Sequence, residues 1–372
     1  MLKLITGRAK SGKTARVMDE MAARAARGEN GIWLIVPEQY SHEAERELCR
    51  MCGDGMSLHA EVLSFTRLAR RITDRIGGER RFLTNSGRIL ALNKALENIW
   101  SRLRVYGSAR RGTELQQVLL KAIDELKNAH ITAERLMEEA QSGEDALHDK
   151  LGDLSLILAA YDAVTSRGEL DPGDRMSALA ENLNEHPELR LGAIYIDGFV
   201  DFTPAEREVI HALAGHCTDL TLCLTMEELY EENEVFELSR RTALWFAKLA
   251  ESWGERLELC TMHQSSDTPA AILERYLFGY TEQSFDAEGK VVLCRGSSIQ
   301  QECALAAARA CQLVQSGCRW RDIAVAVRGF EDYRSALEQA FEQYKVPLYV
   351  AGRSDVLQKP LPLMLCSAMD AA

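Results

Sequence analysis

A phosphate-binding loop near the start of the chain constrains the fold more than any other feature. Residues 7–14 read Gly-Arg-Ala-Lys-Ser-Gly-Lys-Thr and match the pattern GxxxxGK[ST] in full. The preceding residues 2–6 are predicted to form a strand, and residues 13–27 a helix that ends at Gly28. A strand, this loop and a helix in that order are the context that the motif requires, so we expect an α/β fold.

The residues of this loop have separate roles in binding a nucleotide. Its glycines allow backbone N–H groups to turn toward phosphate oxygens, and the helix N-terminus adds partial positive charge. Lys13 is expected to reach the β- and γ-phosphates, and the Thr14 hydroxyl to hold Mg²⁺. The alternative is a glycine-rich turn before a surface helix. The predicted nucleotide-binding residues of the loop are Gly7, Arg8, Ala9, Lys10, Ser11, Gly12, Lys13 and Thr14.

A second carboxylate is expected at the end of a neighbouring strand. The run Ile-Tyr-Ile-Asp at residues 194–197 ends in Asp197, which predicts a metal ligand alongside Thr14. Helicase-type ATPases usually place a glutamate base directly after this aspartate, but here the position is Gly198. Loss of a general base removes typically 10²–10⁴-fold of rate. We therefore expect the site to bind ATP·Mg²⁺ but to hydrolyse ATP weakly, unless Asp201 or Glu206 takes the place of the missing base. No catalytic residue is assigned. The alternative is that Asp197 caps a turn.

The strand and helix patterns divide into two α/β regions and one helical region. Between about residues 84 and 184 helical periodicity dominates, which predicts an all-helical insertion. Thr203 is expected to cap a helix that begins at Pro204. The strands predicted for the first α/β region are residues 2–6, 31–36, 61–65, 193–197 and 220–224, with a helix that is capped by Ser41 and runs to about Arg50. For the second region we predict strands at 291–294, 323–327 and 348–350 and helices at 298–315 and 332–343. The sequence ends soon after that region begins, so we expect it to be only part of a domain.

Charge is distributed unevenly along the chain. The net charge is −12, which by itself argues against a nucleic-acid partner. Residues 1–111, however, hold 21 Lys and Arg against 12 Asp and Glu, a net +9, and the remainder holds 23 against 44, a net −21. Such asymmetry is typical of chains that contact nucleic acid in one region.

An arginine-rich helix is predicted within the basic region. Arg67, Arg71 and Arg75 are spaced i, i+4, i+8 and share one helical face, with Arg70 beside them. Arg80 and Arg81 follow. Such a face is suited to phosphates; the alternative is an ordinary solvated basic face.

The remaining composition indicates a protein of the reducing cytoplasm. No apolar run approaches the roughly 20 residues of a membrane helix, and the N-terminus does not resemble a signal peptide. Ten cysteines are scattered, and the one CxxC pair, Cys49 and Cys52, has no second pair of matching spacing for zinc. Buried thiols are therefore favoured over a metal or redox site.

Taken together, five sequence blocks resemble the AddB family, the B subunits of bacterial AddAB helicase–nucleases. Besides the phosphate loop, the blocks are VPEQ at 36–39, EVLSFTRLA at 61–69, YIDGFVDFTP at 195–204 and WRDIAVAVR at 320–328. The resemblance extends over essentially the whole chain and corresponds to the N-terminal part of the longer family members.

The resemblance implies a fold and a domain order. We expect a P-loop RecA-like helicase domain with an all-helical insertion, followed by part of a second RecA-like α/β domain. The expected boundaries are 1–80 and 188–286 for the two parts of the first domain, 81–187 for the insertion and 287–372 for the start of the second. Arg328, at the end of a predicted strand, would reach a γ-phosphate as an arginine finger does. An iron–sulfur cluster is expected only in a C-terminal nuclease domain outside these residues.

The resemblance also implies a function. The family acts with an AddA-like subunit on single- and double-stranded DNA at double-strand breaks, which are unwound and resected by helicase and exonuclease activity for homologous recombination. Its helicase-like part scans single-stranded DNA for a hotspot sequence (Chi) and is less a motor than a reader. The expected DNA-binding residues are Gln39, His42, Phe65, Arg67, Arg70, Arg71 and Phe199, with Phe202 as a further candidate. Family members often carry Trp where this chain has Arg70, which exchanges base stacking for phosphate attraction.

Two other functions are compatible with the phosphate loop. A small-molecule P-loop kinase with a helical lid would account for the loop and the acidic total charge, but not for the arginine helix. An active translocating motor is disfavoured by Gly198.

Overall fold

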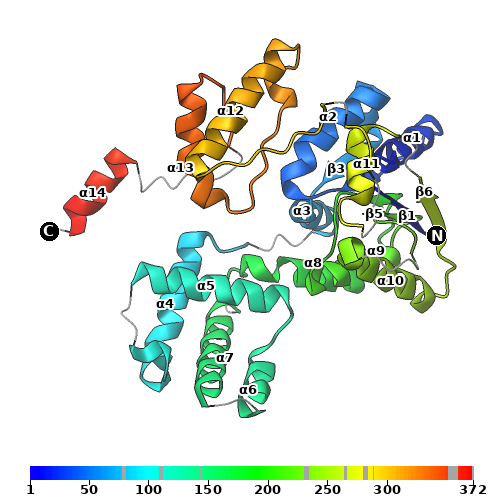
Figure 1. Cartoon of the computed structure of the whole chain (residues 1–372). Coiled ribbons are helices and arrows are strands. Elements are labelled where there is room, and N and C mark those ends of the chain that lie inside the picture. Colours follow the sequence, from blue (N-terminus) through cyan, green and yellow to red (C-terminus); the bar gives the residue numbers. More distant parts are fainter. Residues whose placement is uncertain are drawn as a thin grey trace. The chain divides into compact units, whose positions relative to one another are not determined.

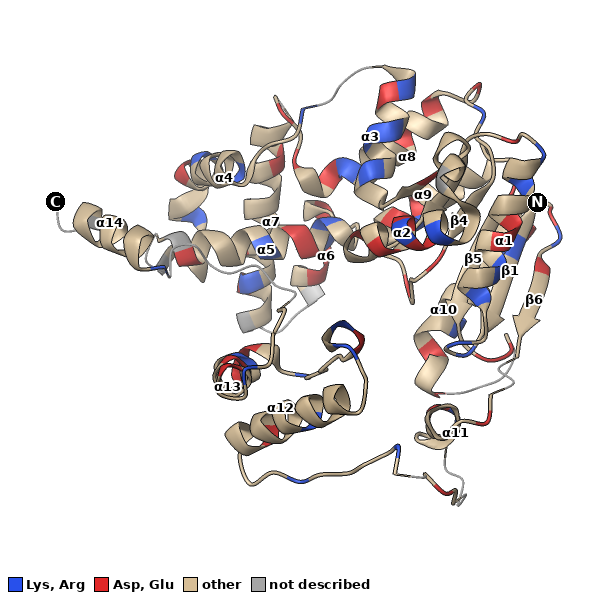
Figure 2. Cartoon of the chain, turned by 90° about the horizontal axis from the view of Figure 1, so that it is seen from above, with Lys and Arg blue, Asp and Glu red and all other residues tan. Residues whose placement is uncertain are grey.

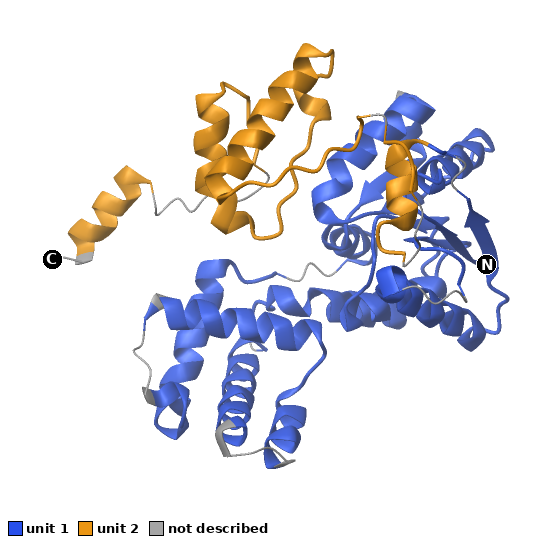
Figure 3. Ribbon diagram, in the orientation of Figure 1, with its two compact units in different colours: residues 1–267 blue, residues 268–372 orange. Residues whose placement is uncertain are grey.

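A computed structural model of the chain describes residues 1–77, 81–108, 112–142, 145–166, 168–229, 234–263, 266–279, 284–287, 289–350 and 359–370. The chain forms two compact units, residues 1–267 and 268–372 (Figure 3). The first unit combines a parallel sheet with a helical region, and the second is helical in its described residues. None of the described helices is long and apolar enough to cross a membrane.

A fully parallel sheet forms the centre of the first unit. Within the described residues its strand order is β3-β2-β4-β5-β1-β6, and every neighbouring pair is parallel, with Leu2 opposite Leu220 and Trp33 opposite Ile194. The α/β prediction is confirmed. The strands are β1 (Leu2–Gly7), β2 (Ile32–Ile35), β3 (Ala60–Leu63), β4 (Ile194–Ile196), β5 (Leu220–Thr225) and β6 (Glu258–Met262).

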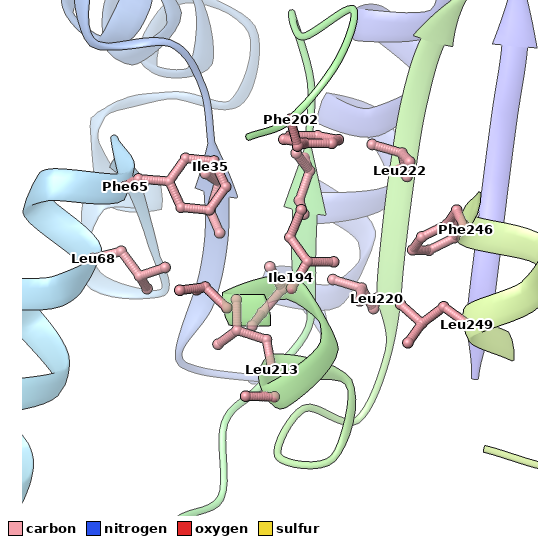
Figure 4. Packing of buried hydrophobic residues seen from close by; sticks show 14 of the residues in the cluster. Ile35, Phe65, Leu68, Ile194, Phe202, Leu213, Leu220, Leu222, Phe246 and Leu249 are labelled. Carbon is pink, nitrogen blue, oxygen red and sulfur yellow. The ribbon is translucent and has the colours of Figure 1, made fainter. Parts of the chain in front are cut away.

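Helices cover both faces of this sheet, as expected for parallel strands joined by crossovers (Figure 1). On one face Val17 and Met21 of α1 pack with Leu48 of α2 against the strands. On the other, Leu68 of α3, Leu213 of α9 and other apolar side chains form the larger cluster (Figure 4). The covering helices are α1 (Lys13–Ala26), α2 (Ser41–Cys52), α3 (Phe65–Ile76), α8 (Arg175–Glu185), α9 (Pro204–Ala214) and α10 (Glu237–Ser252).

The helical region has a core of its own. Leu92, Leu119, Ile157 and Tyr161 are all buried in one cluster. The chain enters and leaves this region side by side, because Leu83 N donates to Leu170 O at 2.9 Å. Its helices are α4 (Asn85–Ile99), α5 (Thr113–Asn128), α6 (Ala133–Ser142) and α7 (Asp145–Thr165), followed by α8. The described residues of this region form no strand longer than a single bridge, in agreement with the helical periodicity.

The second unit contains the expected helices but not the expected strands. Cys303 and Ala307 of α12 pack against Leu337 and Phe341 of α13. The predicted strands at 291–294, 323–327 and 348–350 are wrong: these residues form no strand with any other described segment. Hydrophobic composition favours extended backbone, but a strand also needs a neighbour to bond its N–H and C=O groups. The helices are α11 (Pro269–Tyr276), α12 (Ile299–Gln315), α13 (Phe330–Gln343) and α14 (Pro360–Asp370).

Three smaller details of the first unit also differ from the predictions. Phe65 begins α3 instead of ending a strand, because the Ser64 hydroxyl accepts a capping bond from Arg67 N at 3.3 Å. Ser41 lies inside α2, after a 3₁₀ turn at Glu38–Tyr40, and its hydroxyl donates to Glu38 O at 2.9 Å. Strand β6 was not predicted, and it forms the sheet edge beside β1.

Candidate nucleotide-binding site

The phosphate loop connects the end of β1 to the start of α1. The carbonyl oxygen of Met262, at the end of β6, approaches the loop so closely that a Cβ added at Gly7 would lie 2.5 Å from it. Gly7 also has φ +157°, which side chains rarely adopt. Lys10 holds the left-handed conformation at φ 58°. The local backbone therefore depends on a glycine at this first motif position.

Lys13 extends back into the loop. Its side chain is almost fully buried, and Nζ donates to Gly7 O at 2.7 Å and to Arg8 O at 2.8 Å. An ammonium group held over loop carbonyls lies where anionic phosphates would be attracted. The motif lysine is thus positioned by the loop itself.

Thr14 and Asp197 meet although 183 residues separate them in sequence. Thr14 Oγ1 donates to Asp197 Oδ2 at 2.7 Å, while Asp197 Oδ1 accepts from Gly198 N at 2.8 Å. The strand order brings them together, since only β5 lies between β4, which precedes Asp197, and β1, which precedes the loop. Asp197 is buried at 7 % exposure. A hydroxyl and a carboxylate in contact at this edge are the oxygen ligands that Mg²⁺ prefers.

Gly198 occupies the position of the missing base with a backbone that suits glycine. Its φ is +85°, and a Cβ there would lie 3.2 Å from Pro37 Cδ. The turn that begins at Pro37 is therefore packed against the end of β4. Gln39 and His42, both exposed, follow Pro37 on this same side, in the turn and at the start of α2.

The two carboxylates considered as substitute bases are engaged elsewhere. Asp201 Oδ1 accepts bonds from Arg207 Nη2 at 2.6 Å, Thr242 Oγ1 at 3.0 Å and Phe202 N at 2.7 Å. Burial raises the pKa of Asp201, but these bonds, with that from Arg207 foremost, outweigh it and hold the pKa below its usual value. Glu206 forms the capping box of α9 with Thr203, which confirms the predicted N-cap.

Sequence reasoning did not find two residues that contact Arg8 in the phosphate loop. Glu227, just after β5, forms an ion pair with the Arg8 guanidinium, and the ring of Phe236 lies 5.1 Å below it. No motif in the sequence marks either residue. Their position follows from β5 lying next to β1, which becomes known only with the strand order.

Figure 2 shows Lys and Arg residues along α3, but the arginines of this helix do not form one exposed row. Arg71 forms an ion pair with Glu61, and Arg75 lies 4.7 Å over the buried ring of Trp33, where burial lowers the pKa of its guanidinium. Arg67 and Arg70 are exposed, and neither takes part in an ion pair with another described residue. Arg80 lies outside the described residues. Of the predicted row, two guanidinium groups remain open to a ligand.

The predicted aromatic residues lie together behind the N-terminus of α3. The ring centroids of Phe65 and Phe199 are 5.5 Å apart, and Phe202 lies 5.1 Å from Phe199. Phe65 and Phe202 are buried at 7 % and 4 %, whereas Phe199 is half-buried. Phe199 is therefore the ring of this cluster that offers more of its surface to a base. Arg328, exposed, belongs to the second unit.

Comparison with known proteins gives a consistent result. The family model described as ADDB, N-terminal, matches residues 4–270. Similar curated proteins include the B subunits of the ATP-dependent helicase/deoxyribonucleases of Desulforudis audaxviator, 30% identical over 390 residues, and of Alkaliphilus oremlandii, 29% identical over 383 residues. Each alignment covers 99% of this chain and 33% of the relative. The chain thus spans about a third of the length of the curated relatives it matches.

Proposed function

The chain belongs to the AddB N-terminal family, and from this premise we propose that it is the helicase-like part of the B subunit of a helicase–nuclease. In this role it binds ATP and single-stranded DNA while the complex processes double-strand ends for recombinational repair. The relatives are named as B subunits of ATP-dependent helicase/deoxyribonucleases. The name implies a further subunit, which we propose to be AddA-like, and the proposal places any nuclease or iron–sulfur function in the parts of the relatives that this chain does not match.

One observation carries the nucleotide part of the proposal: the contact of 2.7 Å between Thr14 Oγ1 and Asp197 Oδ2, beside a loop that contains Lys13. These residues fit ATP·Mg²⁺. Thr14 and Asp197 would hold the metal, and Lys13 and the loop N–H groups the phosphates. When bound, Mg²⁺ neutralises charge on the phosphate oxygens. The strand order, with β4 and β1 separated by β5, supports the proposal that this is a RecA-like domain.

We propose that hydrolysis at this site is weak. Gly198 offers no carboxylate, and Asp201 and Glu206 are engaged in hydrogen bonds that hold α9 and α10. A group other than the side chains of Asp201 and Glu206 would then have to orient the attacking water. Arg328 of the second unit is proposed as a further cation for the γ-phosphate, as in the family's helicase-like fold.

We propose that single-stranded DNA follows the side of the sheet that carries the phosphate loop and the N-terminus of α3. Gln39 and His42 beyond β2, together with Phe199 beyond β4, would contact bases. Arg67 and Arg70 would contact phosphates, since both are exposed. We expect Arg71 to contribute less to DNA binding than Arg67 and Arg70, because it already forms an ion pair with Glu61. The proposed role is the scanning of a hotspot sequence and not translocation.

Two measurements on the chain test this function. A fluorescent ATP analogue with Mg²⁺ should bind to the wild type and not to Lys13→Ala, while Lys248→Ala, which removes an exposed lysine of α10 outside the loop, serves as the control. Phosphate release should remain slow when single-stranded DNA is added. Brisk DNA-stimulated turnover would contradict the scanning role, and transfer of phosphate to a metabolite without DNA binding would favour a kinase.

A further inference from the structure

A second site lies between the sheet and the helical region, apart from the phosphate loop. A pocket of about 540 Å³ is enclosed by α3, by α8 and by the segment that enters the helical region. Small-molecule sites typically measure about 300–1,000 Å³, so its volume suits one nucleotide. The residues that matter below are Arg70, Arg81, Phe82 and Arg175, all of which line this pocket.

The backbone opposite α3 is held in place by a single β-bridge between Phe82 and Leu170, which we call the clasp. Leu170 N donates to Arg81 O and Leu83 N donates to Leu170 O, both at 2.9 Å. These bonds tie the entrance of the helical region to its exit. Arg81 and Phe82 therefore face α3 from a braced segment, which is what a preorganised site requires.

Three arginines from three different segments line the pocket. Arg70 comes from α3, Arg81 from the clasp and Arg175 from α8. None of them takes part in an ion pair among the described residues, whereas Arg71 is paired with Glu61. The wall also contains Asp74 and Glu169, so the side chains of the lining carry a net charge of +1. The pocket thus offers unpaired cations suited to a phosphate group.

The pocket also contains a planar aromatic surface. The Arg175 guanidinium lies 4.6 Å over the Phe82 ring, and Phe82 is half-buried. Flat rings and guanidinium planes bind unstacked bases with little regard to sequence. Cationic side chains that can bind phosphate, placed beside a surface on which a base can stack, are the combination that recognises a single nucleotide.

We propose that this pocket holds one unstacked nucleotide of single-stranded DNA, with its base at Phe82 and its phosphates at Arg81 and Arg175. The inference rests on the proposed DNA-binding function and adds a site to it. Arg70 lines this pocket and also the groove of about 420 Å³ that it shares with Arg67. A strand that contacts Arg67 would therefore reach the pocket by crossing α3 at Arg70.

The first test measures the salt dependence of oligo(dT) binding to the whole chain. The double variant Arg81→Ala/Arg175→Ala should lower the slope of log Kobs against log salt by about 1.4, since each phosphate contact contributes about 0.7 for single strands. At 0.1 M salt this corresponds to about 25-fold weaker binding. The matched control Arg240→Ala/Arg241→Ala removes two cations of α10, of which Arg240 is half-buried and Arg241 is exposed. It should leave the slope of log Kobs against log salt unchanged.

The second test begins with cross-linking of the wild-type protein, which does not depend on a variant that folds, and adds one conservative variant, Phe82→Leu. An oligonucleotide that carries 5-iodouracil should cross-link on irradiation to the peptide that contains Phe82, and Phe82→Leu should weaken binding about tenfold. Cross-linking only outside residues 81–82 would overturn the pocket, as would an unchanged salt slope. Binding of free deoxynucleotides here, with oligonucleotide binding unaffected by the variants, would overturn it in favour of a small-molecule site. Failure of the wild type to bind any single strand would instead contradict the proposed function.

Discussion

Gly198 directly follows Asp197 in the candidate nucleotide-binding site, at the position where motor ATPases carry a glutamate base. Its backbone conformation allows a quantitative test of whether this position can accept such a side chain. Its φ of +85° lies in the left-handed region, where an L side chain costs roughly 1–2 kcal/mol. A Cβ would also press on Pro37 Cδ at 3.2 Å, which is tighter than most such contacts. We therefore expect Gly198→Ala to lower the free energy of unfolding by about 1–3 kcal/mol.

Two companion variants separate the sources of this cost. Gly53 has nearly the same φ, +81°, but no atom within 4 Å of its added Cβ, so Gly53→Ala should show the backbone cost alone. Gly198→Glu adds the carboxylate that motor ATPases use. Because its side chain would start from a strained backbone beside the buried Asp197, we expect no gain in ATP hydrolysis over Gly198→Ala.

The assays are urea unfolding and DNA-stimulated phosphate release. With slopes of about 1–3 kcal/mol per molar urea, the expected destabilisation moves the midpoint by roughly 0.3–3 M, and by about 1 M at the middle of both ranges. If Gly198→Ala unfolds at the same urea concentration as the wild type, the strain argument is wrong. If Gly198→Glu hydrolyses ATP more than tenfold faster than Gly198→Ala, the geometry does accept a base and the reasoning is refuted.

Three further predictions concern other parts of the protein. Asp171 is fully buried and accepts bonds from Arg88 Nε at 2.8 Å and from the Tyr161 hydroxyl, so Asp171→Ala should cost about 1–3 kcal/mol in urea unfolding by removing the acceptor of these buried donors, while Arg88 keeps its ion pair with Asp124; an unchanged midpoint would contradict this. Burial raises the pKa of the Cys217 thiol to about 12, so at pH 8 iodoacetamide should label the exposed Cys294 and leave Cys217 unmodified, as read by peptide mass spectrometry. The pKa of Asp201 is lowered on folding, so its stabilising contribution is present above about pH 4 and disappears as the pH falls through the folded pKa; the difference in unfolding free energy between the wild type and Asp201→Asn should therefore shrink below pH 4.

Local sequence signals predicted the elements of the first unit well. The loop motif marked the end of β1, and the Thr203–Pro204 pair marked the start of α9, because each signal acts through a few neighbouring residues. The segments after residue 290 that were predicted as strands show the limit of such reasoning. Their apolar residues favour extended backbone, but pairing depends on strands far away in sequence, which no local pattern specifies.

The candidate site could be predicted only in part for the same reason. Lys13, Thr14 and Asp197 were predicted because their motifs mark them, and the strand order brings Thr14 and Asp197 into contact. Glu227 and Phe236 contact the loop only through the position of β5 and carry no motif. The ion pair between Arg71 and Glu61 could likewise not be predicted, because the sequence of a helix does not show which side chains of a neighbouring strand contact it.

The pairing of β1 has a consequence for how the protein is made. Both neighbours of β1, the strands β5 and β6, come from residues 220–225 and 258–262. At the usual pace of about 5–20 residues per second, a ribosome needs roughly 13–50 s after it has made β1 to deliver both of them. Until then β1 lacks the neighbours that it has in the folded sheet. The candidate nucleotide site is thus completed long after its loop has been made, so a nascent chain that stalls within the helical region would expose β1 to chaperones.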